Sequence, residues 1–423
     1  MTTLAALRVE YWPIERLVEY PRNPRKNDAV VDQMVASIRQ FGFAIPVLAR
    51  SSGEVIDGHL RLKAARKMGS WPGGDTTRIP VIPCDGWNDA QVKAFRLMVN
   101  RSVGWADWDD EFLALELLDL KDLDFDLGLT GFDDEELARL LASQNAAEGL
   151  KDEDAVPELP ETPISVAGDL WILGDHKLLV GDATNQADVA KLMADDAADL
   201  IFTDPPYNVD YEGYMEERLK IKGDRMSDAE FKLFLEAAFR SCRPVVKPGA
   251  SLYVCHSSSW QREFQNALEA AGFTVRCQVV WAKNTFAWGF GRYKFQHEPI
   301  FYCHVAGQKD PWYGDKSQST LWQEKKPAAN RIHPTAKPVE LIERALLNSS
   351  KAGDVVADLF GGSGSTLIGC ERRNRKARLM EIDPKYGDVI VKRWEEHTGK
   401  KATLDGSGRN FEEVASKRQK EAS

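Results

Sequence analysis

Residues 354–366 read DVVADLFGGSGST, and this stretch decides the fold class of the chain. An apolar strand ends at Asp358, and a glycine-rich turn then enters a helix. Glycines let a backbone approach a ligand closely, and the N-terminus of a helix offers N–H groups that have no partner in the helix. The stretch therefore predicts a ligand site at the carboxyl end of a buried strand.

A second strand ends in an acid about twenty residues later, where Arg378-Leu379-Met380 leads to Glu381. In a doubly wound sheet, such an acid can accept hydrogen bonds from ribose hydroxyls. A nicotinamide dinucleotide site is the alternative. Such a site uses the spacing Gly-x-Gly-x-x-Gly. This spacing fails here, because the sixth position counted from Gly362 is Leu367 and not glycine.

On both sides of this turn, short apolar strands alternate with helices between about residues 164 and 399. This alternation is typical of an α/β domain. The expected strands are Leu178–Val180, Leu200–Thr203, Ser251–Cys255, Val275–Trp281, Pro299–Cys303, Val355–Leu359 and Ala377–Glu381.

The motif that carries the chemistry is Asp-Pro-Pro-Tyr at residues 204–207, directly after an apolar strand. Two prolines stop the strand and fix a rigid corner. The Asp204 carboxylate and the Pro205 carbonyl are neighbouring acceptors, which suits an exocyclic amino group with two N–H donors. Tyr207 supplies an aromatic plane for a base turned out of a duplex. The motif predicts a site for an amino-bearing base.

Two weaker motifs accompany these. His333-Pro334-Thr335-Ala336-Lys337-Pro338 precedes a helix expected over Val339–Asn348, and Gly181-Asp182 follows the first expected strand. Either can be an ordinary turn when read alone. Their positions in this frame favour a role near the ligand.

Residues of about 164–400 closely resemble the beta-class DNA amino-methyltransferases, the adenine-N6 and cytosine-N4 family. The chain has the order of that class, with Asp204–Tyr207 first, then His333–Pro338, then Asp358–Gly364. The resemblance implies a Rossmann-like sheet of seven mostly parallel strands that binds S-adenosyl-L-methionine. The stretch between Ala306 and Ile332, where many members carry a target-recognition domain, is short.

The resemblance also implies the site residues. The catalytic set is expected to be Asp204, Pro205, Pro206 and Tyr207. The set near the cofactor is expected to be Asp182, Thr335, Lys337, Asp358, Phe360, Gly361, Gly362, Gly364 and Glu381. No metal site is expected.

The N-terminal region resembles the smaller α/β ParB/sulfiredoxin-like domain, through Asn23-Pro24-Arg25 and residues 57–65. Relatives use a Gly-x-x-Arg turn at a helix start to hold nucleotide phosphates, which suits Gly58 and Arg61. A phosphate-binding or DNA-contacting role, a docking role and nuclease activity all stay open.

The net charge of −10 is concentrated in one segment. Residues 106–161 contain 19 acidic and 3 basic side chains, which leaves a net charge of +6 for the rest of the chain. The rest can therefore present basic faces to phosphate. We expect an acidic helical connector, with a DNA-mimicking flap as the alternative. The expected division is 1–105 ParB-like domain, 106–163 connector and linker, 164–400 methyltransferase domain and 401–423 charged tail.

The sequence thus predicts a DNA methyltransferase that moves a methyl group from S-adenosylmethionine to N6 of adenine in double-stranded DNA. N4-cytosine methylation, RNA or protein methylation, and a ParB-like binding protein with an inert methyltransferase domain are the alternatives. We expect a cytoplasmic protein of a bacterium or phage-infected cell, with no membrane partner. A bound nucleotide, a homodimer and a restriction–modification partner stay open.

Overall fold

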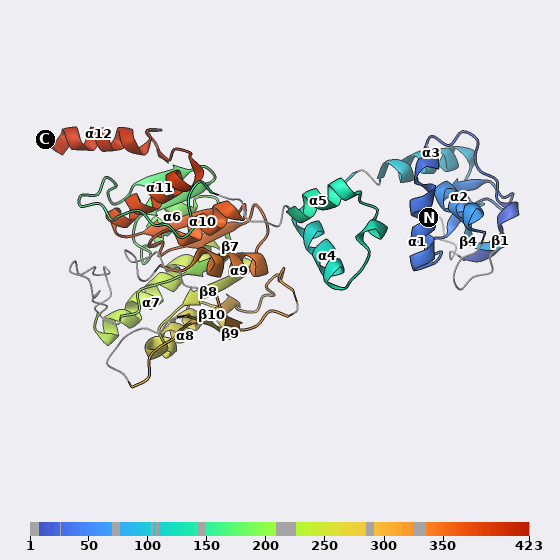
Figure 1. Ribbon diagram of the computed structural model, residues 1–423. Helices are drawn as coiled ribbons and strands as arrows, with labels where there is room; N and C mark the ends of the chain where they lie inside the picture. The colour runs from blue at the N-terminus through green and yellow to red at the C-terminus, as the bar shows by residue number, and fades with distance from the viewer. Residues whose placement is uncertain are drawn as a thin grey trace. The chain divides into compact units, whose positions relative to one another are not determined.

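The computed structural model in Figure 1 describes residues 8–25, 27–69, 77–102, 105–106, 108, 110–142, 149–208, 226–284, 292–315, 317–324 and 336–422. The chain divides into two compact units, Met1–Asn145 and Ala146–Ser423. Within the described ranges, no helix is long and apolar enough to cross a membrane.

The first unit begins with a four-stranded sheet in the order β1-β4-β2-β3. The strands are β1 (Glu10–Pro13), β2 (Val47–Ala49), β3 (Val55–Asp57) and β4 (Arg78–Pro83). The helices with them are η1 (Ile14–Arg16), η2 (Asp28–Val30), α1 (Val31–Phe41), α2 (His59–Met68) and α3 (Asp89–Ser102). The expected helix over residues 59–68 is confirmed, because Leu62, Ala64 and Ala65 pack into the core of this sheet.

The acidic segment contributes a small helical cluster to the same unit. Its helices are α4 (Asp110–Asp122), η3 (Leu127–Thr130) and α5 (Asp134–Ala142). Leu117, Leu137 and Leu140 are buried together between them. The segment therefore has a core of its own, which a plain connector would not need.

The second unit is built on a ten-stranded sheet, in the order β11-β9-β10-β8-β7-β12-β13-β6-β5-β14. The strands are β5 (Leu170–Leu173), β6 (His176–Val180), β7 (Ala198–Thr203), β8 (Val246–Cys255), β9 (Phe273–Ala282), β10 (His297–Val305), β11 (Leu321–Trp322), β12 (Val355–Asp358), β13 (Lys376–Glu381) and β14 (Thr403–Leu404). Strands β8, β7, β12, β13 and β6 run parallel, and β10 is antiparallel to both of its neighbours.

The expected mostly parallel α/β sheet is confirmed, but its strand count is larger than seven. The seven expected strands form the continuous centre from β9 to β6. Three short strands, β5, β11 and β14, extend the two edges. They contain two to four residues each, too few for a recognisable periodic pattern.

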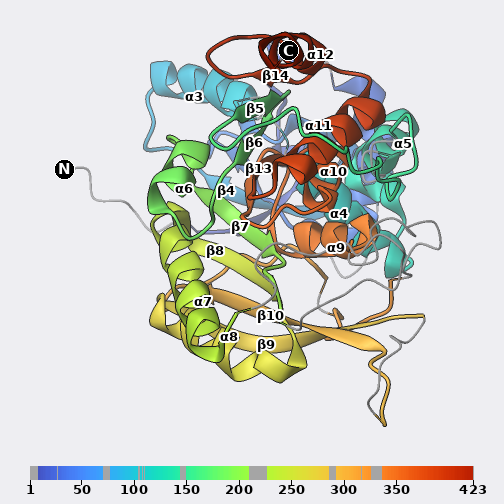
Figure 2. The same ribbon diagram turned by 90° about the vertical axis from the view of Figure 1, so that its left-hand side faces the viewer.

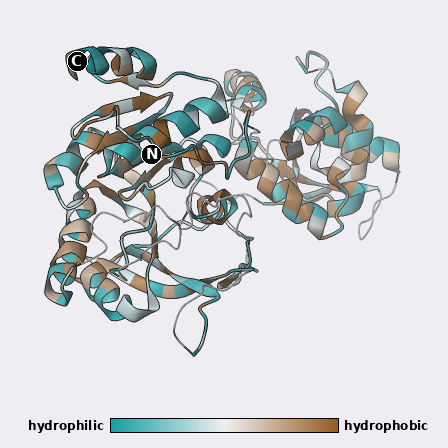
Figure 3. Ribbon diagram, turned by 60° about the vertical axis from the view of Figure 1, so that its left-hand side comes forward, coloured by the Kyte–Doolittle hydropathy of each residue, from teal (hydrophilic) through white to brown (hydrophobic). Residues whose placement is uncertain are grey.

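Helices cover both faces of this sheet, as Figure 2 shows. On one face lie α6 (Gln186–Met193), α7 (Asp228–Cys242), η4 (Arg243–Val245), η5 (Ser258–Trp260) and α8 (Gln261–Ala270). On the other lie α9 (Val339–Ser349), α10 (Ser365–Arg372) and α11 (Pro384–Thr398). Figure 3 shows the hydrophobic strands between helices that carry hydrophilic residues on their outer sides. This is the doubly wound arrangement, which places ligands at the carboxyl ends of the parallel strands.

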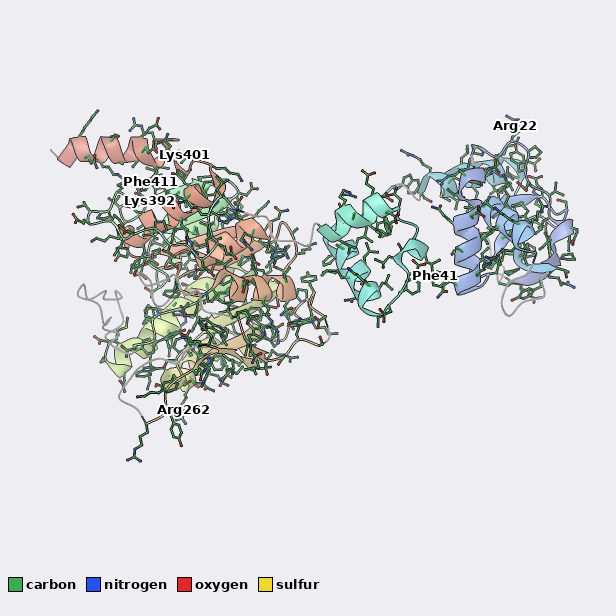
Figure 4. All side chains as sticks on the ribbon, viewed as in Figure 1. Arg22, Phe41, Arg262, Lys392, Lys401 and Phe411 are labelled. Carbon is green, nitrogen blue, oxygen red and sulfur yellow. The ribbon has the colours of Figure 1, made fainter. Side chains whose placement is uncertain are left out.

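The end of the chain differs from the expected charged tail. Helix α12 (Phe411–Ala422) follows β14, and Phe411 and Val414 are buried in the core of the second unit. Arg418 forms a bidentate ion pair with Asp169, in which Nη1 donates to Oδ2 at 2.6 Å and Nη2 donates to Oδ1 at 2.9 Å. Lys392 lies over the ring of Phe411, and both are labelled in Figure 4. Burial of Phe411 and Val414, two apolar side chains on one helical face, fixes this end of the chain.

Candidate active site

Three neighbouring parallel strands, β7, β12 and β13, deliver the main site residues to one edge of the sheet. Asp204 follows β7, the glycine-rich turn follows β12, and Glu381 ends β13. Thr203 Oγ1 donates to Asp358 Oδ1 at 3.1 Å, and Gly362 N donates to Glu381 Oε2 at 2.8 Å. The structure therefore brings together the two acidic strand ends and the loop between them.

The glycine-rich turn is fixed by Asp358, which is 4% exposed. Its carboxylate accepts bonds from Thr203, from Phe360 N at 3.1 Å and from Thr366 Oγ1 at 2.6 Å. Burial raises the pKa of Asp358 to about 6, although these hydrogen bonds act to lower it. Gly364 has φ +84°, and a Cβ there would lie 3.2 Å from Ile390. Asp358 thus holds the turn in place, and the turn needs glycine.

Glu381 is the acid with the clearest fit to a ribose. It is 8% exposed, and its two oxygens accept bonds from Gly362 N and from Asp383 N at 2.8 and 2.9 Å. Burial raises the pKa of Glu381 to about 7. Each carboxylate oxygen retains a second lone pair. A carboxylate oriented in this way can accept both hydroxyls of a ribose.

Asp204 lies in a cluster of charged and phenolic groups. Tyr207 donates its hydroxyl to Asp204 Oδ1 at 2.6 Å, and Lys337 Nζ donates to Asp204 Oδ2 at 2.5 Å. Burial, followed by the charge of Asp204, raises the pKa of the Tyr207 phenol well above its usual value. The phenol is therefore protonated and acts as a donor. Both oxygens of Asp204 already accept a hydrogen bond in this arrangement.

Lys337 belongs to this cluster, although the sequence assigned it to the cofactor. It is 8% exposed, and its ammonium also lies 3.1 Å from Glu298 Oε2. Burial opposes the charge, but Asp204 and Glu298 hold the pKa of Lys337 above its usual value. The residue is a buried, charged partner of the loop that holds Asp204.

Glu298 and Lys283 lie in two segments, residues 281–284 and 297–300, that resemble later sheet motifs of the amino-methyltransferases, but the sequence predicted no role for either residue. Lys283 Nζ donates to Glu298 Oε1. Burial favours the neutral acid, yet Lys337 and Lys283 lower the pKa of Glu298 to about 2. The two residues pair across the ladder of β9 and β10, where His297 stands opposite Ala282. Besides that resemblance, the sequence shows a charged residue at the end of each strand of an apolar pair.

The remaining expected residues lie as follows. Pro205 is buried and Pro206 is half-buried. Asn208, at φ +53°, follows Tyr207 and forms two hydrogen bonds with the backbone of Met226.

On the side expected to face the cofactor, Asp182 accepts hydrogen bonds from Thr184 N and Thr184 Oγ1, both at 2.8 Å. Gly361 N bonds to Met380 O at 2.8 Å, which seats the turn against β13. Thr335, with His333 and Pro334, lies outside the described residues.

In the first unit, Gly58 and Arg61 lie at the start of α2 as expected. Gly58 has φ +101°, a conformation that favours glycine. Arg61 Nη2 donates to Asp57 Oδ2 at 2.8 Å, while Arg61 Nε is buried without a partner among the described residues. An anion at this turn would therefore have to share Arg61 with Asp57.

Comparison with known proteins gives two family models that match parts of the chain. A family model described as DNA methylase, of the N6/N4 type, matches residues 198–392. The chain contains an N6/N4-type DNA methylase domain. A second model, described as the ParB-methyltransferase HTH domain, matches residues 111–167. The acidic segment, which the sequence analysis described as a connector, is thus similar to a helix-turn-helix domain found beside methyltransferases.

The chain is also similar to one curated protein and to two solved structures, among others. Type II methyltransferase M.HinfI from Haemophilus influenzae is 27% identical over 252 residues, which cover 52% of this chain and 68% of that protein. The structure of the M1.HpyAVI–SAM complex is 23% identical, with a TM-score of 0.41, and covers 51% of this chain and 97% of that one. The structure of truncated ParB from Caulobacter crescentus complexed with CTP-gamma-S is 21% identical, with a TM-score of 0.26, and covers 32% and 78% of the two chains.

Proposed function

We propose that the methylase domain transfers a methyl group from S-adenosyl-L-methionine to N6 of adenine in double-stranded DNA. The observation that carries this proposal is the bonding of the three loops after β7, β12 and β13. Thr203, next to Asp204, donates to Asp358, and the glycine-rich turn donates to Glu381, which supports a site where Asp204 holds the base and Glu381 the ribose. The bound donor supplies a methyl group already activated on a sulfonium.

The chain's own residues position the base. The target amino group donates one N–H to Asp204 and the other to the Pro205 carbonyl, while the ring of Tyr207 stacks on the base. Holding both hydrogens keeps the nitrogen lone pair directed at the methyl carbon. Positioning and electrostatics account for the acceleration, since no covalent enzyme intermediate is required.

Transfer forms the nitrogen–carbon bond as the carbon–sulfur bond breaks, and the sulfur leaves as a neutral thioether. Positive charge develops on the nitrogen beside the Asp204 carboxylate, which stabilises it. The nitrogen then loses one proton through Asp204 to water. The product is the methylated amino group.

On the cofactor side, we propose that Glu381 binds the ribose and that Phe360, Gly361, Gly362 and Gly364 line the methionine end. Asp182 and Thr335 complete this set near the cofactor. Asp358 acts on the turn through its hydrogen bonds to Phe360 and Thr366.

The variant Asp204→Ala tests the catalytic assignment. It should abolish methyl transfer, because both the amino-group acceptor and the compensating charge are lost. Binding of S-adenosylmethionine should stay within about threefold, because Glu381 and the glycine-rich turn are unchanged. Transfer of a radioactive methyl group to unmethylated DNA measures the first effect, and isothermal titration calorimetry measures the second.

The matched control is Asp195→Ala, an exposed aspartate before the opposite end of the same strand, which should methylate at the wild-type rate. If Asp204→Ala also methylated at the wild-type rate, the assignment would be wrong.

The choice of adenine is the finer part of the proposal. The resemblance to the amino-methyltransferases supports this choice, because it implies that aspartate followed by Pro-Pro-Tyr favours adenine over cytosine. N4 of cytosine presents the same two N–H donors to the same acceptors. Only the identity of the product separates the two substrates.

For the first unit, we propose an anion site at Gly58 and Arg61 that takes a nucleotide phosphate or the DNA backbone. The glycine conformation at the start of α2 supports it, since helix N-termini bind anions. Binding measured with inorganic triphosphate, for the full chain and its Arg61→Ala variant, tests it. Equal binding by both proteins would contradict the proposal.

A further inference from the structure

Four charged side chains form a continuous chain beside the catalytic loop. In order they are Asp204, Lys337, Glu298 and Lys283, joined by contacts from Lys337 to both acids and from Lys283 to Glu298. All four side chains are between 7% and 27% exposed. Two negative and two positive charges balance one another, which lowers the cost of burying the group.

The two acids do not hold Lys337 equally. Lys337 Nζ donates to Asp204 Oδ2 at 2.5 Å, with hydrogen-bond geometry. Glu298 Oε2 lies 3.1 Å from the same nitrogen in an ion pair that lacks the angular geometry of a hydrogen bond, and this oxygen is buried. Buried carboxylate oxygens are rarely left in this state. Glu298 therefore shares the ammonium with Asp204 and can accept a well-aligned hydrogen bond from it after a small movement of Lys337.

The proposed reaction gives this second acceptor of the Lys337 ammonium a role. Asp204 Oδ1 is taken by Tyr207 and Asp204 Oδ2 by Lys337, so an incoming amino group must share or displace one of them. An ammonium released from Asp204 inside the protein needs another anionic acceptor, because a buried unpaired charge is costly.

We propose that Glu298 is a positioning residue that receives the Lys337 ammonium when the target amino group binds to Asp204. This inference rests on the proposed function and adds a residue to its machinery. Lys283 holds the other oxygen of Glu298 and so keeps the carboxylate directed at Lys337. No proton or methyl group moves through Glu298. Its role is to free Asp204 for the base without leaving the ammonium unpaired.

The test separates charge from shape. Glu298→Gln keeps the size of the side chain and removes its charge, whereas Glu298→Asp keeps the charge and removes a methylene. We expect Glu298→Gln to lower kcat by about 10- to 100-fold, as for loss of a charged hydrogen bond in the reacting complex. We expect Glu298→Asp to retain most of kcat. The KM for S-adenosylmethionine should stay within about threefold for both variants.

Glu343→Gln is the control. Glu343 is also a buried glutamate with two cationic partners, but these are Arg372 and Arg373, outside the cluster. It should lower the stability of the protein and leave kcat unchanged.

The measurement uses the full chain, DNA from a host without DNA methyltransferases, and kcat determined by methyl incorporation. A Glu298→Gln variant with wild-type kcat would overturn the inference. So would a Glu298→Asp variant as slow as Glu298→Gln, since a packing role penalises the smaller side chain at least as much. A wild-type protein that methylates no base would contradict the proposed function and, with it, this inference.

Discussion

Glu381 gives the site a dependence on pH. Its pKa is raised to about 7 from an ordinary value of 4.5 by burial, with smaller contributions from Asp383 and Asp358. The folded, unbound protein therefore binds this proton more tightly than the unfolded chain. The stability that this proton contributes is lost as the pH rises from about 4.5 to about 7.

The affinity for S-adenosylmethionine should increase as the pH rises, whereas the stability falls. Two ribose hydroxyls donate to the ionised carboxylate, so S-adenosylmethionine should bind about tenfold more weakly at pH 6 than at pH 8. Calorimetric titration in buffers of different ionisation enthalpy measures both the affinity and the proton released.

The variant Glu381→Gln is the control for this dependence, because its side chain does not titrate. It should bind the ligand weakly, with an affinity that changes little between the two pH values. Equal affinities of the wild-type protein at pH 6 and pH 8 would contradict the role of Glu381.

At the residue scale, the sequence predicted the acids at strand ends but not their partners. Asp204 and Glu381 stand at recognisable strand ends, where parallel topology brings residues together. Lys337 and Asp204 are 133 residues apart, and no periodic pattern encodes which cation meets which acid. The contacts of Glu298 were not predicted for the same reason, since they form only when β9, β10 and residue 337 meet.

At the scale of elements, the start of α9 is held by a segment from before the methylase sheet. Val339 N donates to Asp154 Oδ1 at 2.9 Å, while the residue before the helix, Pro338, provides no side-chain cap. Arg393 joins the same segment to the glycine-rich turn, through Glu153 O at 2.7 Å and Ser363 O at 2.9 Å. This segment therefore contacts both sides of the site.

Replacing Asp154 by alanine should affect stability and catalysis together. Loss of the cap should lower the free energy of unfolding by about 1 kcal/mol. It should also lower kcat severalfold, because Lys337 lies two residues before Val339. Urea denaturation and methyl incorporation measure the two effects.

Asn410→Ala is the matched control, since Asn410 Oδ1 accepts from Glu413 N at 2.9 Å at the start of α12, beside the edge strand β14. It should lose similar stability and keep the wild-type kcat. An unchanged kcat in Asp154→Ala would show that this cap does not position Lys337.

The long elements were predictable and the short edge elements were not. The seven central strands and helices α2, α5 and α9 follow apolar runs whose periods are clear in the sequence. Helix α12 was missed because its charged composition conceals one apolar face. Phe411, Val414 and Arg418 have helical spacing and could have shown it.

At the scale of the whole molecule, two different family models match separate parts of the chain, residues 111–167 and 198–392. The acidic segment forms helices with a small core, and a ParB-methyltransferase HTH model matches it. Its negative charge had favoured the prediction of a connector over that of a folded domain. The four-part division expected from the sequence remains our proposal, with the folded end of the chain added to the methylase unit.

The central claim is the identity of the product, and nucleoside analysis tests it most directly. The full chain is incubated with S-adenosylmethionine and double-stranded DNA from a host without DNA methyltransferases. The DNA is then digested and its nucleosides identified by mass spectrometry. The account predicts N6-methyladenine, absent from the Asp204→Ala reaction. N4-methylcytosine would contradict the assignment to adenine, and unmethylated DNA would contradict the proposed function as a whole.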